Sequence, residues 1–67
     1  MNIKIFTERK LRWSNENRKM NDIIEIFAEL PDGSITIDCN SAFEVLYRIE
    51  KFKSYHPDDN IEWVVVN

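Results

Sequence analysis

The segment Leu-Pro-Asp-Gly-Ser at positions 30–34 constrains the fold more than any other part of this 67-residue chain. Proline presets φ for a turn, and the only glycine of the chain can adopt the positive φ that closes a hairpin. After the turn, Ile35, Ile37 and Cys39 alternate with polar residues, as in a half-buried strand. The segment therefore predicts a hairpin between strands at 22–30 and 34–39.

The run before this turn fits two structures. Its apolar residues follow a helical spacing as well as a strand: Ile23, Ile24, Ile26, Phe27 and Leu30. Two observations favour the strand. Turns of this type join antiparallel strands through short loops, and Glu25 and Glu29 would repel each other at the i,i+4 spacing of a helix.

The next segment has the pattern of a helix. Ser41 and Glu44 form a capping box at its start, and Pro57 stops any continuation. One apolar stripe at helical spacing runs through Ala42, Val45, Leu46, Ile49 and Phe52. These signals predict a helix over 41–54.

The two ends of the chain also have the pattern of strands, at 2–13 and 61–66. The last segment, Ile-Glu-Trp-Val-Val-Val, carries apolar residues on both faces, which predicts an interior strand or one covered on both sides. The polar stretch from Ser14 onward predicts a connecting loop up to residue 22.

Together these elements predict one small α+β domain over residues 1–67, in the order β-β-β-α-β. The sheet would be four-stranded and mostly antiparallel, with one helix packed on one face. The helical crossover would bring the last strand parallel to the first. A chain of this length buries a small core, so a homodimer or a permanent partner would help to stabilise it.

One helix covers only one face of such a sheet, so the other face should be bare. The covered face is expected to hold Ile3, Ile5, Ile24, Ile26, Ile35, Ile37, Trp63 and Val65. The bare face would then expose a group of apolar side chains that monomeric proteins rarely leave in water: Phe6, Ile23, Phe27, Val64 and Val66. A second copy, another protein or the 14–22 loop would cover it.

A second candidate interface lies on the helix. Phe43 and Tyr47 are one turn apart and far from the apolar stripe, which would make them an aromatic anchor for a partner. The alternative is that Phe43 packs under a strand end.

Charge divides the chain unevenly. Residues 1–20 hold six basic and two acidic side chains, whereas residues 21–67 hold three basic and ten acidic ones. A basic ribbon could grip phosphates and stack a base, through Lys4, Lys10, Arg12, Trp13, Arg18 and Lys19. The net charge of −3 argues against a nucleic-acid binder and favours a ribbon that complements the acidic remainder.

The sequence holds no glycine-rich phosphate loop and no metal or nucleophile motif, so we expect no cofactor and no enzyme activity. His56, with Asp58 and Asp59, falls in a polar loop after the helix. Cys39 has the pattern of a small core residue rather than a reactive thiol. No segment approaches the roughly 18–20 apolar residues of a membrane span, and a lone cysteine is typical of a reducing compartment, so a cytoplasmic location is expected.

The sequence thus favours a small intracellular protein-binding module that acts through the bare sheet face and flanking charges. By analogy of size and acidity, it would be a phage or mobile-element inhibitor of a host protein or defence system. Two alternatives remain: a nucleic-acid-binding protein that uses the basic ribbon, and a small ribonuclease-type toxin that uses His56.

Overall fold

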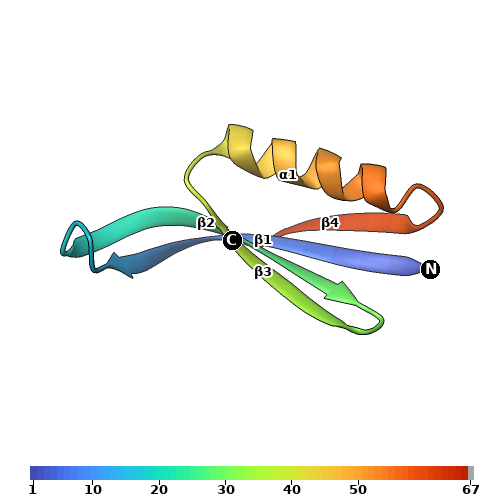
Figure 1. Ribbon diagram of the computed structural model, residues 1–67, viewed down its shortest axis with the longest axis horizontal. Coiled ribbons are helices and arrows are strands. Elements are labelled where there is room, and N and C mark those ends of the chain that lie inside the picture. The colour runs from blue at the N-terminus through green and yellow to red at the C-terminus, as the bar shows by residue number, and fades with distance from the viewer. Residues whose placement is uncertain (67) are drawn as a thin grey trace.

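A computed structural model describes residues 1–66 of the chain (Figure 1). The elements are β1 (Asn2–Ser14), β2 (Lys19–Leu30), β3 (Gly33–Cys39), α1 (Ala42–Tyr55) and β4 (Asn60–Val66). The strands form one sheet in the order β3-β2-β1-β4, in which β4 runs parallel to β1 and the other pairs are antiparallel. The predicted α+β class, the element order and the strand at 22–30 are confirmed.

The first hairpin is longer than predicted. β1 continues to Ser14 and β2 begins at Lys19, so a turn at 15–18 replaces most of the expected 14–22 loop. Ser14 Oγ accepts a hydrogen bond from the Asn17 amide at 3.2 Å, and Arg18 takes a positive φ of 52° that helps to close the turn. The turn lies at the tip of a ribbon that projects to one end of the molecule (Figure 1), so it does not fold over the sheet.

The capping box forms and fixes the start of α1. Ser41 is the N-cap and its Oγ accepts from the Glu44 amide at 3.2 Å, while the Glu44 carboxylate accepts from the Asn40 amide at 2.8 Å. Only Asn40 and Ser41 separate β3 from α1, so the helix begins beside the end of β3.

The core lies between α1 and the sheet and is centred on β2. Val45 and Ile49 of α1 are buried against residues of three strands, with Phe52 packed at the edge of the same cluster. Strand side chains in this buried cluster are Ile5, Ile26, Ala28 and Cys39.

The helix covers less of its face than the sequence predicted. Leu46 of the predicted stripe is 48% exposed. Three sheet residues assigned to the covered face also stay open, Ile35 at 42%, Trp63 at 40% and Val65 at 63%. A helix that starts at the end of β3 and packs through Val45 and Ile49 lies over the β2 side of the sheet, which leaves Trp63 and Val65 of β4 uncovered. Ile35 stays open because β3 is the other edge of the sheet.

The last strand lies beside β1 and parallel to it, as predicted, but the expectation of an interior strand, or of one covered on both sides, is wrong. β4 is an edge strand rather than an interior one, and none of its residues is buried. The physical reason is the topology, because a parallel strand added beside β1 becomes the new edge of the sheet.

Candidate functional site

A short apolar row crosses the face of the sheet opposite α1, which we call the bare face. Phe6 of β1 pairs with Phe27 of β2 on one side and with Val64 of β4 on the other. The two phenyl rings lie with centroids 6.4 Å apart at a tilt of 39°. All three side chains are half-buried, and no helix within residues 1–66 lies over them. The structure thus brings three of the predicted interface residues together.

The other two predicted residues of this face lie further along. Val66 is one row from Phe6, opposite Glu8, and is half-buried. Ile23 is opposite Lys10 and only 7% exposed, so the expectation that it stands in water is wrong. Its neighbours on this face are Lys10, Arg12 and Glu25, and the methylene stems of long charged side chains cover apolar surface.

Charged residues flank the apolar row on both sides. On the hairpin side, Arg12 donates to Glu25 at 2.7 Å and to Asp38 at 3.2 Å, and Lys10 lies 3.1 Å from Glu25. On the other side, Lys4 is opposite Glu29 in β2 and Glu62 in β4. The bare face therefore has an apolar centre and a polar rim that carries both signs of charge.

The ion pairs on the hairpin side hold Glu25 in its charged form. A hydrogen bond from Lys10, with a further contribution from Arg12, lowers the pKa of the Glu25 carboxyl below its ordinary value of 4.5. The hydrogen bonds that Arg12 donates to Asp38 and, second, to Glu25 raise the pKa of Arg12. These charges are therefore largely satisfied within the chain.

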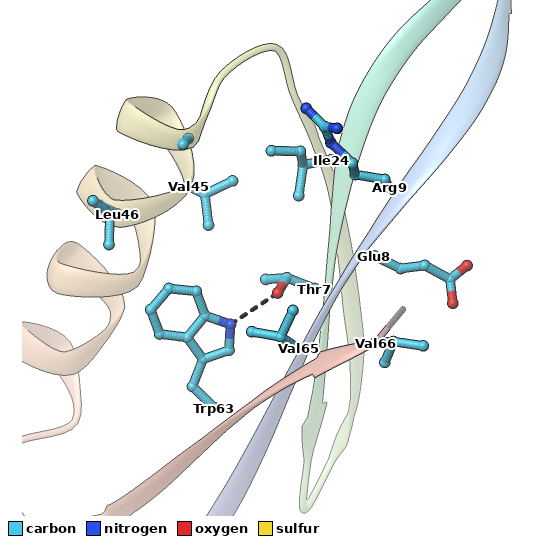
Figure 2. Close-up of a pocket in the computed structure, with 10 residues that line it drawn as sticks. Thr7, Glu8, Arg9, Ile24, Val45, Leu46, Trp63, Val65 and Val66 are labelled. Atoms are coloured by element: carbon cyan, nitrogen blue, oxygen red, sulfur yellow. Dashed lines mark hydrogen bonds between the residues drawn. The ribbon is translucent and has the colours of Figure 1, made fainter.

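A groove opens on the opposite side of the sheet, between α1 and β4 (Figure 2). It has a volume of about 550 Å³ and is mostly apolar, with Ala42, Val45 and Leu46 of α1 on one side and Trp63 and Val65 of β4 on the other. Thr7 and Ile24 lie between these walls, and Arg9 stands at the rim.

The Trp63 indole is fixed within this groove. Its N–H donates to Thr7 Oγ1 at 2.9 Å, and Thr7 is only 4% exposed (Figure 2). The hydrogen bond ties the ring to β1.

Phe43 and Tyr47 do not join the bare face. Both lie on α1, on the other side of the sheet, and they are 86% and 60% exposed. The Lys51 ammonium lies 5.5 Å from the centre of the Tyr47 ring. The predicted interface residues thus belong to two separate surfaces, and Phe43 does not pack under a strand end.

The candidate nucleic-acid residues are dispersed. Strand alternation and register place Lys4, Lys10 and Arg12 on the bare face and Trp13 on the helix side. Lys10 and Arg12 are engaged in ion pairs, and the Trp13 indole donates to Asn15 at 2.9 Å. The remaining two, Arg18 and Lys19, lie at the tip of the ribbon (Figure 1).

His56 has structural contacts at the end of α1. Its amide donates to the Lys53 carbonyl, its ring lies 4.5 Å from that of Phe52, and Nδ1 is 3.1 Å from the Asp59 carboxylate. This loop and the basic ribbon tip occupy opposite ends of the molecule (Figure 1).

Cys39 lies in the core and is fully buried. Burial raises the pKa of its thiol, which keeps the group protonated and unreactive. Within residues 1–66, His, Cys, Asp and Glu form no group of three or more placed to hold a metal, and no helix is long and apolar enough to cross a membrane.

Sequence reasoning missed the groove and the open β4 edge. The apolar residues on both faces of 61–66 are the one sequence signal at this edge, and they predict a covered strand. Comparison of the chain with protein-family models, with curated proteins and with solved structures gave no match. The geometry alone therefore supports the functional proposal below.

Proposed function

We propose that this protein is a small non-enzymatic module that binds another protein through its bare face. The observation that carries this proposal is the row Phe27–Phe6–Val64, which is apolar, half-buried and flanked by charged rows. An apolar, aromatic-rich centre inside a polar rim is the usual anatomy of a protein interface.

The charges favour a protein partner over a nucleic acid. The chain carries a net −3, and two of its candidate phosphate contacts, Lys10 and Arg12, are paired with carboxylates. A phosphate backbone would have to compete with Glu25 and Asp38 for them. A protein partner needs only an apolar patch bordered by polar groups, which matches the bare face.

The contacts of His56 support a role without catalysis. Its ring is held by Asp59 and packed on Phe52, at the opposite end of the molecule from the basic ribbon tip that a ribonuclease-type site would combine with it (Figure 1). This arrangement favours a loop-stabilising role for the histidine.

The finer form of the proposal is an inhibitor, of phage or mobile-element origin, that acts in the cytoplasm on a host protein or defence system. Its support is the small size, the acidic balance and the single, buried cysteine, which suits a reducing compartment. Co-expression with the captured partner tests this form, because an inhibitor lowers the partner's activity and a passive ligand does not.

The experiment is affinity capture from the native host with two matched variants. Phe27→Asp places a charge in the apolar row, and Leu11→Asp places the same charge on an exposed residue of the helix side, 62% accessible. Both should keep the circular dichroism spectrum of the parent. We expect Phe27→Asp to weaken retention of the captured protein at least about tenfold, as for a central interface residue, and Leu11→Asp to retain it.

Equal retention by both variants would contradict the proposal. Salt-sensitive binding of labelled RNA or DNA that Arg12→Glu abolishes and Phe27→Asp leaves intact would favour the nucleic-acid alternative instead.

A further inference from the structure

The outer edge of β4 is open along its length. Within the described part of the chain, residues 1–66, the strand pairs only with β1; four of its seven residues are exposed and the other three are half-buried. Edge strands in natural proteins are usually guarded by lysine, proline, a bulge or a covering element. β4 has neither lysine nor proline between Asn60 and Val66, and its one charged residue is Glu62.

From this edge we infer that the chain forms a symmetric dimer in which β4 of one copy pairs antiparallel with β4 of a second copy, centred on Trp63. Two edge strands join antiparallel under a two-fold axis perpendicular to the sheet, which keeps both helices on the same side. The two four-stranded sheets would then form one continuous sheet.

Self-complementarity is the reason to choose a second copy as the occupant. With the axis at Trp63, all seven residues of β4 find a partner: Asn60 faces Val66, Ile61 faces Val65, Glu62 faces Val64, and the two Trp63 residues face each other. The only charge thus meets a valine and never its own copy. Directly opposed like charges would destabilise the pair.

Neighbouring registers are less favourable. An axis at Glu62 places the two carboxylates opposite each other, and also pairs Val66 with a residue before the strand begins. An axis at Val64 matches only residues 62–66 and leaves Asn60 and Ile61 without a strand partner. The register centred on Trp63 uses the whole strand and avoids the repulsion.

The dimer would cover the apolar surface that α1 leaves open. Val65, 63% exposed, would pack against Ile61 of the partner.

The test is the mass in solution of the wild-type protein and two matched variants, measured by sedimentation over a range of concentrations. Val65→Lys inserts a charge into the proposed interface, and Leu11→Lys inserts it at an equally exposed residue, 62%, on the same side of the sheet. We expect twice the chain mass of 8.1 kDa for wild type and Leu11→Lys, and a dissociation constant at least tenfold higher for Val65→Lys.

A wild-type protein that stays at the mass of one chain at its highest soluble concentration overturns the inference. So does a dimer that Leu11→Lys disrupts and Val65→Lys does not.

Single cysteine substitutions test the register, since the native Cys39 is fully buried and silent. Oxidation should cross-link Trp63→Cys faster than Val64→Cys, because only residue 63 faces its own copy. Faster cross-linking at 64 would overturn the register.

The dimer does not depend on the proposed function, because the bare-face row is a different surface. Phe27→Asp should leave the dimer mass unchanged while it weakens capture of a protein partner, so the two proposals can fail separately.

Discussion

The two edges of the sheet differ in how they meet solvent. β3 alternates, with Ser34, Thr36 and Asp38 toward the bare face and apolar residues toward α1. β4 carries valines on the bare face and Trp63 and Val65 on the helix side, with no helix packed over them. The two edges therefore differ in side-chain pattern: β3 is polar on the bare face and apolar toward α1, whereas β4 is apolar on both faces.

The space on either side of α1 shows the same difference. Toward β3, a cavity of about 60 Å³ remains between Ile49, Phe52 and the strands, whereas the groove toward β4 measures about 550 Å³. We therefore expect the contacts of α1 on the β3 side to contribute most to the stability of the fold, and the β4 side to be the one that binds another chain.

The largest expected effect tests this division on the helix itself. The substitution Ile49→Ala removes a side chain that is only 2% exposed, and it should lower the free energy of unfolding by about 2–5 kcal/mol. Leu46→Ala, on the open side at 48% exposure, should cost less than about 1 kcal/mol. Urea denaturation of both variants provides the measurement, and similar losses would contradict the division.

A smaller effect is expected at the junction that seats α1 beside β3. Ser41→Ala removes the acceptor for the Glu44 amide and should lower the free energy of unfolding by about 1 kcal/mol. Ser41→Gly, which also lacks the acceptor but tolerates the cap conformation, should lower the free energy of unfolding by only about 0.3 kcal/mol. An unchanged stability in Ser41→Ala would show that the cap does not hold the helix start.

The smallest effect concerns the ion pairs of Glu25 with Lys10 and Arg12 on the bare face. The pKa of Glu25 is lower in the folded state than its ordinary value of 4.5. The ion pairs of Glu25 therefore stabilise the fold above about pH 4.5, and this stabilisation is lost as the pH falls through the folded-state pKa. In thermal melts between pH 7 and pH 3, Glu25→Gln should lose less stability on acidification than wild type, and the difference should be less than about 1 kcal/mol. Parallel pH profiles would mean that the pairing adds no stability.

Local signals were sufficient for most of the fold. The Pro31–Gly33 turn, the Ser41 cap and the alternation of β3 each depend on neighbouring residues, and each appears as predicted. The hairpin at 15–18 was placed as a longer loop, because its closing residue is Arg18 at a positive φ rather than a glycine or asparagine.

The candidate site was only partly predictable. Strand parity placed Phe6, Phe27 and Val64 on one face, but the register that sets them in one row depends on pairing between distant segments. The burial of Ile23 and the exposure of Val65 depend on where long side chains and α1 come to rest, which periodicity does not encode.

Hydrogen exchange of the backbone amides at two protein concentrations tests the central claim most directly, because it observes both edges in one experiment. If β4 is the associating edge, those of its amides that point away from β1 gain protection as the concentration rises, and the outer amides of β3 do not change. Protection that rises along β3 instead, or along neither edge, would contradict the account.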